Sequence, residues 1–294
     1  MRVFSAEFCP CCMGPLVVSA AQDLSCINCR LFSSVSLRLW LGLDDICPIN
    51  FNHEAVSRLE YLGDQNHFWI RGRYQLVKSL LRRLHGATTR QWDTALELGC
   101  GAGLMLPLLE EHAKCVVAMD GHRSLLLRAF DVSNRTIVLQ GDVTNTKLNG
   151  REFDLITAFD VLEHLDADVF LSEARRLARN DAKLLISVPA FNFLWSDMDT
   201  RAGHRCRYNW AQLKVDLLRN GWHPMGHTYY QFLLFPLVYF SRRVDLVTST
   251  RYERRPPSGL DWVFGTINHL EVALLNGFTL PFGSSLFAWA SLKK

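Results

Sequence analysis

A glycine-rich turn between a predicted strand and a predicted helix constrains the fold of this chain more than any other feature. Residues 96–103 read Leu-Glu-Leu-Gly-Cys-Gly-Ala-Gly; residues 92–98 predict a strand before the turn, and closely spaced leucines after it predict a helix. Glycines let the backbone approach a ligand beside the positive end of a helix dipole. Such turns are typical of the nucleotide-binding crevice in doubly wound α/β sheets.

The spacing of the glycines disfavours NAD or FAD as the ligand. A dinucleotide fingerprint needs a third glycine three residues after the second, and Leu104 occupies that position counted from Gly101. Glu97 lies two residues before Gly99, the first glycine, and Gly101 and Gly103 follow at the same two-residue spacing. This pattern resembles the first motif of the class I S-adenosylmethionine-dependent methyltransferases. The resemblance implies that Glu97 and the glycines bind S-adenosylmethionine.

Acidic side chains follow the next two predicted strands. Residues 115–119 predict a buried strand that ends at Asp120, whose carboxylate can accept hydrogen bonds from both ribose hydroxyls of a nucleoside. Residues 136–140 predict a third strand, which is followed by Asp142 and Val143. The resemblance implies that Asp142 contacts the adenine amino group and that Val143 lies beside the base.

A fourth strand, predicted at residues 153–159, leads into Asp160-Val161-Leu162-Glu163-His164-Leu165, which is similar to the fourth motif of the family. A fifth strand is predicted at 184–188, and 285–292 is predicted as a last edge strand. The resemblance places Asp160 in the cofactor site. It also implies an α/β, Rossmann-like fold with a seven-stranded, mostly parallel sheet whose last strand is antiparallel.

Four cysteines near the start of the chain have the spacing of a metal site. Cys9 with Cys12 and Cys26 with Cys29 form two Cys-x-x-Cys pairs with thirteen residues between them. Four thiolates with this spacing suit tetrahedral structural zinc, and a short segment would gain much of its folding free energy from the metal. We predict a zinc ribbon over residues 1–45; disulfides are the alternative, which a reducing cytosol disfavours.

Length and composition support one sizeable α/β domain with a small appendage. The chain has 294 residues, of which 49% are hydrophobic and 21% are charged. Its formal net charge of +3 is too small to indicate a nucleic-acid ligand by itself. We find neither a secretory signal nor an apolar run long enough to span a bilayer, so we expect a cytoplasmic enzyme.

The remaining chain is divided into a helical segment at 46–90 and a methyltransferase domain at 91–294, with an insertion at about 226–283. In related methyltransferases, an aromatic-arginine segment covers the methionine end of the cofactor. Arg73 could therefore pair with the cofactor carboxylate, and Trp69 could face the sulfonium or simply pack on the sheet. We expect the insertion to cover the sheet or to form a homodimer contact; a lid or a membrane-touching helix is the alternative.

Two histidines are candidates for the base that an oxygen or nitrogen acceptor needs. His164 follows the fourth strand and His204 follows the fifth, and each could instead only brace its own loop. The stretch from Trp195 to Tyr208 is similar to a bacterial small-molecule branch of the family, of the methyltransferase type 11 kind. We therefore predict Trp195 and Tyr208 as substrate-binding residues and a small apolar or aromatic metabolite as the methyl acceptor.

Three alternatives to this interpretation stay open. Ribosomal-RNA methyltransferases can also place a zinc ribbon before a class I domain, although the ribbon here carries few basic residues. The chain could also be a non-methylating protein that binds S-adenosylmethionine. Finally, Asp160, Glu163 and His164 resemble the Glu-x-x-Glu-His that holds a divalent ion in some methyltransferases, an interpretation that we rank below the metal-free one.

Overall fold

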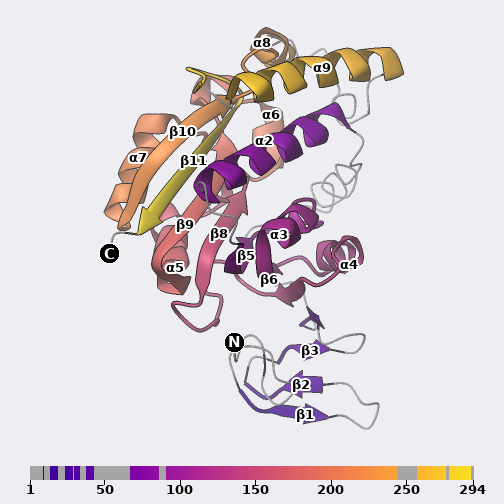
Figure 1. Ribbon diagram of the computed structural model, residues 1–294, viewed down its shortest axis with the longest axis vertical. Helices are drawn as coiled ribbons and strands as arrows, with labels where there is room; N and C mark the ends of the chain where they lie inside the picture. The colour runs from indigo at the N-terminus through magenta and orange to yellow at the C-terminus, as the bar shows by residue number, and fades with distance from the viewer. Residues whose placement is uncertain are drawn as a thin grey trace.

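The computed structural model describes most of the predicted methyltransferase domain and part of the N-terminal segment (Figure 1). The described residues are 9, 14–18, 24–28, 30–33, 38–42, 67–85, 91–243, 257–275 and 278–292. Cys12 and Cys29, two of the four predicted zinc ligands, lie outside them, as do residues 46–66 and 86–90 of the predicted helical segment and 244–256 of the insertion.

An eight-stranded sheet forms the centre of the fold, with strand order β10-β11-β9-β8-β5-β6-β7-β4. The strands are β4 (Leu39–Trp40), β5 (Trp92–Leu98), β6 (Ala113–Asp120), β7 (Ile137–Gln140), β8 (Phe153–Phe159), β9 (Ala178–Pro189), β10 (Trp222–Tyr230) and β11 (Ser285–Leu292). Each pair from β9 through β8, β5, β6 and β7 to β4 is parallel, whereas β11 is antiparallel to both β9 and β10.

Two details of the predicted sheet are wrong. The sheet has eight strands instead of seven because Leu39–Trp40, before the predicted domain, pairs with β7 at one edge. Strand β11 is antiparallel as predicted, but it lies between β9 and β10 and is not an edge strand. Strand β10 runs through Gly226 to Tyr230, so the helices of the insertion begin only after this strand.

Helices cover both faces of the sheet (Figure 1). They are α2 (Phe68–His85), α3 (Leu106–His112), α4 (Arg123–Val132), α5 (Ala167–Leu177), α6 (Asp197–Arg201), α7 (Trp210–Arg219), α8 (Phe235–Arg243) and α9 (Ser258–Leu275), with 3-10 turns η1 (Leu162–His164) and η2 (Asn192–Leu194). Along β5, Leu96 and Leu98 pack in the core with α5 and α7, whereas Ala95 packs with α2, α3, α4 and α9. This alternation follows from the two-residue side-chain period of a strand.

The N-terminal segment is attached to the edge of the central sheet. It contains a three-stranded sheet of β1 (Leu16–Val18), β2 (Leu24–Cys26) and β3 (Phe32–Ser33) before β4. The Val138 amide donates to the Arg38 carbonyl at 2.6 Å, and the Gly42 amide donates to the Gln140 side chain at 2.7 Å. Trp40 is 2% exposed, so this attachment buries a large apolar side chain.

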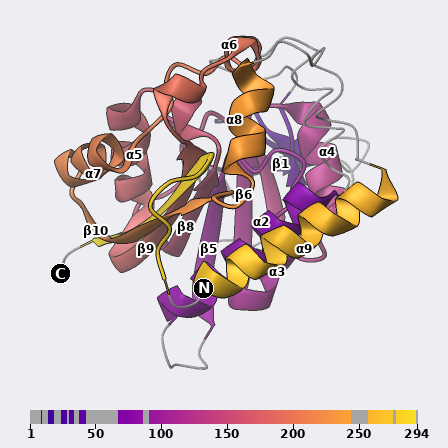
Figure 2. The same cartoon turned by 90° about the horizontal axis from the view of Figure 1, so that it is seen from above.

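Helix α9 of the insertion packs on α2 and supplies a cap for its first turn. The Asp261 carboxylate accepts a hydrogen bond from the Phe68 amide at 3.1 Å and pairs with Arg71 at 3.1 Å. In Figure 1, α8 and α9 lie at the end of the molecule opposite the small N-terminal sheet, and Figure 2 shows the molecule from that end. No described helix is both long enough and apolar enough to cross a membrane.

Candidate active site

A cavity of about 210 Å³ lies where strands β5, β6, β7 and β8 end. This edge is where ligands bind in open parallel sheets, because the chain leaves each strand there and returns through a helix. Nine of the ten predicted cofactor-binding residues line the cavity, namely Trp69, Arg73, Glu97, Gly99, Gly101, Asp120, Asp142, Val143 and Asp160. The tenth, Gly103, does not.

The glycine turn explains this difference. Gly99, Gly101 and Gly103 have φ values of +74°, +52° and +78°, which are strained for residues with a side chain. A Cβ on Gly101 would meet no atom within 4 Å, so the bare backbone there borders open space in the cavity. A Cβ on Gly103 would lie 2.7 Å from the backbone of Ala129, so this glycine instead permits the close approach of α4.

Asp120 fixes the turn from the end of the neighbouring strand. Its carboxylate accepts hydrogen bonds from the Gly101 amide at 2.9 Å and from the His122 amide at 2.9 Å. On the next strand end, the Asp142 carboxylate accepts from the Thr144 amide and hydroxyl at 2.8 and 2.6 Å. Both carboxylates are therefore held in place by backbone donors while they line the cavity.

Glu97 provides a test of whether the cavity suits a polar ligand. The side chain is in the cavity wall, the residue is 3% exposed, and Oε2 is buried without a hydrogen-bond partner among the described residues. Burial, together with the charge of Asp120, raises the pKa of Glu97 to about 8. A buried acceptor without a partner is costly in a folded protein, and a ligand that donates an N–H or O–H would satisfy it. The residues present therefore fit an S-adenosylmethionine molecule.

Arg73 has internal partners in the cavity wall. Its guanidinium pairs with Asp160 at 2.7 Å, donates to the Ser187 hydroxyl at 2.5 Å, and lies 5.2 Å from the centroid of the Trp69 ring. Asp160 has a φ of +56°, an uncommon conformation that Ser187 supports through a 3.0 Å hydrogen bond. Arg73 was predicted to bind the cofactor carboxylate, and Trp69 was predicted to face the sulfonium. Each would have to do so while Arg73 keeps its contacts with Asp160, Ser187 and the Trp69 ring.

The two predicted catalytic histidines lie side by side. Their rings are inclined at 77° with centroids 4.8 Å apart, although 40 positions separate His164 from His204 along the chain. His164 lines the cavity and its Nδ1 lies 3.3 Å from the Gly203 carbonyl oxygen; His204 does not line the cavity. Burial and the neighbouring His204 lower the pKa of His164 to about 4.

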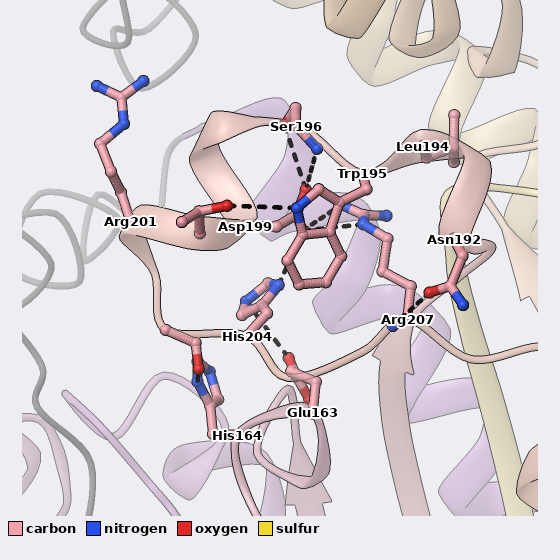
Figure 3. A network of polar contacts seen from close by, with 12 residues as sticks. Glu163, His164, Asn192, Leu194, Trp195, Ser196, Asp199, Arg201, His204 and Arg207 are labelled. Atoms are coloured by element: carbon pink, nitrogen blue, oxygen red, sulfur yellow. Dashed lines mark hydrogen bonds and ion pairs between the residues drawn. The ribbon is translucent and has the colours of Figure 1, made fainter.

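A buried carboxylate orients His204 (Figure 3). Asp199, which is 1% exposed, lies 2.8 Å from His204 Nδ1 and pairs with Arg207 at 2.7 Å and with Arg242 at 2.9 Å. Burial alone would raise the pKa of Asp199, but the hydrogen bond from His204 and the charges of the two arginines hold it well below its usual range. Asp199, Arg207 and Arg242 were not among the residues predicted for the site; the local signal for them was two acidic residues shortly before His204, at positions 197 and 199.

Glu163 lies on the opposite side of the His204 ring from Asp199. Figure 3 shows the His204 ring between Asp199 and Glu163, and the distance from His204 Nε2 to Glu163 Oε1 is 4.0 Å. Glu163 is fully buried, and neither carboxylate oxygen has a hydrogen-bond partner among the described residues. Burial, followed by the charge of Asp160, raises the pKa of Glu163 well above its usual range.

The two predicted substrate-binding residues lie outside the cavity lining. Trp195 is 39% exposed, and its indole N–H donates to the Thr200 hydroxyl at 3.3 Å. Tyr208 is only 5% exposed; its backbone pairs with Pro189 and Phe191 beside the end of β9, and its ring packs in the core. The structure therefore brings the cofactor-binding candidates together with His164, but it does not bring Trp195 and Tyr208 to the same cavity.

Comparisons with known proteins agree with this architecture. Residues 96–186 match the family model described as a methyltransferase domain. A probable S-adenosylmethionine-dependent methyltransferase of Mycobacterium tuberculosis is 30% identical over 127 residues, which are 43% of this chain and 44% of that protein. A probable methyltransferase of Mycolicibacterium smegmatis is 27% identical over 129 residues, 44% of this chain and 48% of that protein. The matched region thus spans less than half of these curated relatives.

Solved structures show the same fold at low sequence identity. A complex of the Haloferax volcanii Trm112 methyltransferase activator with a putative methyltransferase contains a chain that is 15% identical, with a TM-score of 0.55, over 85% of this chain and 100% of that chain. A geranyl diphosphate methyltransferase with S-adenosylmethionine is 12% identical, with a TM-score of 0.51, over 74% of this chain and 84% of that chain. Residues 96–186 therefore resemble the methyltransferase domain of S-adenosylmethionine-dependent methyltransferases, and the sheet around the cavity has the fold of these solved structures.

Proposed function

We propose that this chain transfers the methyl group of S-adenosylmethionine to a small apolar or aromatic metabolite. One observation carries the proposal: a single cavity combines the open backbone at Gly101, the buried acceptor of Glu97 and the His164 ring. The bound cofactor supplies a methyl group that is already electrophilic on a cationic sulfur. The protein therefore has to bind the cofactor and the acceptor, orient them and exclude water, which are tasks that these side chains can perform.

Each wall of the cavity has a separate task in this proposal. Asp120 and Asp142 are held by backbone donors so that their carboxylates can accept hydrogen bonds from the nucleoside. Glu97 accepts from a ligand N–H or O–H. Apolar side chains, among them Trp69 and Phe159, make up the rest of the wall and keep water from the reacting atoms.

Aromatic side chains near the cavity favour an apolar acceptor. Phe191 stacks on Phe193 at 5.3 Å and on Tyr229 at 5.0 Å, and Phe235 of α8 lies 6.3 Å from Phe193. Strand β10 runs in the same direction as β9, because both are antiparallel to β11, so Phe191 and Tyr229 lie at the edge of the sheet where these strands end, although none of the four rings lines the cavity. Phe193 is 52% exposed, which leaves a ring face for an acceptor.

We assign activation of the acceptor to the histidine pair. His164 is the member of the pair that lines the cavity. The neighbouring His204 is held in place by Asp199, whose carboxylate oxygen lies 2.8 Å from His204 Nδ1. An oxygen or nitrogen acceptor that carries a proton must lose it during methyl transfer, and a neutral imidazole is a suitable group to assist that step.

We also propose that structural zinc holds the N-terminal segment through Cys9, Cys12, Cys26 and Cys29. The two described cysteines support this, since Cys9 and Cys26 are 0% and 3% exposed. Each of them donates its amide to the carbonyl five residues later, Gly14 at 2.9 Å and Leu31 at 2.8 Å. Two equivalent turns of this kind suit paired Cys-x-x-Cys ligands. For the whole protein we propose a cytoplasmic enzyme that acts on a small molecule.

Calorimetry with S-adenosylhomocysteine and a transfer assay with labelled S-adenosylmethionine test the function. We expect binding that Asp120→Ala abolishes and that Asp131→Ala, an exposed aspartate of α4, leaves unchanged. The label should appear in a small-molecule fraction of a cell extract. Absence of binding to the wild-type protein would overturn the proposal, and label in RNA, with salt-sensitive retardation of RNA on a gel, would replace the acceptor class with nucleic acid.

A further inference from the structure

We infer that Glu163, His164 and His204 form a site for one divalent transition-metal ion beside the cavity. A carboxylate oxygen of Glu163 and one ring nitrogen of each histidine all lie within 4.8 Å of one another. Two imidazoles and one carboxylate are a common ligand set for such ions, with the remaining coordination positions left for water or substrate.

This set differs from the one expected from the sequence. The sequence pattern grouped Asp160 with Glu163 and His164, but the Asp160 carboxylate pairs with Arg73 at 2.7 Å and accepts from Ser187 at 3.0 Å. His204 takes its place in the cluster because the loop after β9 folds back over η1, where the Arg205 amide donates to the Glu163 carbonyl at 2.7 Å.

Both histidines are oriented as metal ligands usually are. A metal-binding imidazole commonly uses one nitrogen for the ion and donates from the other to a carboxylate or a backbone carbonyl. Here Nδ1 of His204 faces the Asp199 carboxylate at 2.8 Å, and Nδ1 of His164 faces the Gly203 carbonyl at 3.3 Å. An ion would then bind the other nitrogen of each ring, Nε2, which in His204 lies 4.0 Å from Glu163 Oε1.

The burial of Glu163 is the second, independent observation. The residue is 0% exposed, and both of its carboxylate oxygens lack a hydrogen-bond partner among the described residues. A buried carboxylate is costly unless a cation or hydrogen bonds compensate it. Arg73 pairs with Asp160 and Arg207 with Asp199, and within the described part of the chain no arginine forms an ion pair with Glu163. An ion between Glu163 and the two rings would compensate both the charge and the oxygens.

The dimensions require only a small adjustment. Metal bonds to nitrogen and oxygen are about 2.0–2.2 Å long, so two ligands of one ion lie at most about 4.4 Å apart. The distance from His204 Nε2 to Glu163 Oε1, 4.0 Å, is already within this limit. The third ligand must move by a few tenths of an ångström, which rotation of a side chain provides.

The location of the site deepens the proposed function, and this role of the ion rests on that proposal. His164 lines the cavity, so an ion on its Nε2 would present its open positions to the acceptor. A hydroxyl bound there would release its proton to solvent more readily, because a divalent ion lowers the pKa of a bound oxygen group. The oxygen would then form the new bond to the methyl carbon as the carbon–sulfur bond breaks and S-adenosylhomocysteine leaves. The histidine pair would then assist deprotonation through the ion.

A titration of the full-length protein with Mn²⁺ tests the site. The protein is first dialysed against metal-free buffer without a chelator, so that tightly bound structural zinc is retained, and unbound Mn²⁺ is then measured by electron paramagnetic resonance. Mn²⁺ prefers oxygen and nitrogen donors, so the N-terminal thiolates compete poorly for it. We expect one equivalent to bind, and at least tenfold weaker binding in Glu163→Gln and in His204→Gln.

Glu271→Gln is the matched control, because Glu271 is also fully buried but accepts hydrogen bonds from the Phe232 and Leu233 amides at 3.0 Å. Thermal unfolding and S-adenosylhomocysteine binding report whether each variant folds; should Glu163→Gln fail to fold, His204→Gln carries the test. No binding to the wild type at millimolar Mn²⁺, or binding that survives in both variants, overturns the inference. If Mn²⁺ does not bind but S-adenosylhomocysteine does, the metal site is wrong and the proposed function stands. If Mn²⁺ binds as expected but S-adenosylhomocysteine does not, the proposed function is wrong and the metal site stands.

Discussion

Arg73 and Asp160 form an ion pair of 2.7 Å that joins helix α2 to the end of strand β8 across the wall of the cavity. Arg73 is 4% exposed, whereas the Asp160 side chain is 34% exposed, so water screens only one partner. The Arg73 charge also acts on two buried acids, because it lowers the pKa values of both Glu97 and Glu163 against the larger raising effect of burial. The Arg73–Asp160 pair therefore affects both the stability of the fold and the protonation of the acidic groups around the cavity.

The first prediction concerns removal of this charge. Arg73→Met should lower the free energy of unfolding by ~2 kcal/mol, below the value for breaking a fully buried pair because Asp160 is partly solvated. Affinity for S-adenosylhomocysteine should fall as well, since Asp160 loses the partner that holds it at the strand end. Urea denaturation and calorimetry measure the two effects. Arg82→Met, an exposed arginine on the same helix, is the control, and an equal loss there would contradict a specific role for the pair.

The second prediction is a pH dependence that arises from Glu97. Its folded pKa of about 8 is above the ordinary value of 4.5, so between these pH values the folded state holds a proton that the unfolded state releases. The stability contributed by this proton is complete below pH 4.5 and is lost as the pH rises through about 8.

Glu97→Gln cannot ionise and should escape this loss. The variant should match the wild type at about pH 5 and exceed it in free energy of unfolding by about 4 kcal/mol at about pH 9. Urea denaturation of the ligand-free protein at both pH values measures the difference. Glu111→Gln, on exposed residue Glu111 of α3, should show no such divergence. Parallel curves for Glu97→Gln and the wild type would mean that Glu97 titrates normally.

The local part of the fold was predictable from the sequence, and the long-range part was not. Strands β5 and β8 begin and end at the residues expected, 92–98 and 153–159, because apolar runs bounded by turns are local signals. Strand β4 has only two residues, and it is a strand only because β7 offers an edge about a hundred positions later. No periodicity can reveal so short an element.

The site shows the same division. The glycines and the acids at strand ends were predictable since the topology alone brings strand ends together. The approach of His204 to His164 depends on how a loop folds, and so do the ion pairs of Asp199 with Arg207 and Arg242. An aromatic residue in a motif, such as Trp195 or Tyr208, can contact a ligand or pack against other protein side chains, and the sequence does not distinguish these two roles.

The third prediction concerns the attachment of the N-terminal segment. Trp40→Ala should lower the free energy of unfolding by about 3–5 kcal/mol, because it leaves a cavity where a fully packed indole covers the edge of the sheet. Trp262→Ala is the control: Trp262 of α9 is 70% exposed, and its truncation should change stability by less than about 0.5 kcal/mol. Thermal and urea unfolding measure both variants. A small effect of Trp40→Ala would mean that the segment contributes little to the stability of the domain.

The fourth prediction follows from the carboxylate that two arginines share. Asp199→Asn keeps the shape of the side chain but removes its charge, so Arg207, which is 2% exposed, becomes a buried cation without a compensating anion. Removing one partner of a buried pair usually costs about 3–5 kcal/mol, and Arg242, the second partner, loses its contact at the same time. We therefore expect urea denaturation to show a loss of about 3 kcal/mol or more. Asp197→Asn, an exposed aspartate two residues earlier in α6, should remain within about 0.5 kcal/mol of the wild type. If Asp199→Asn were equally harmless, the arginines would have to be solvated in solution, and the orientation of His204 would need another cause.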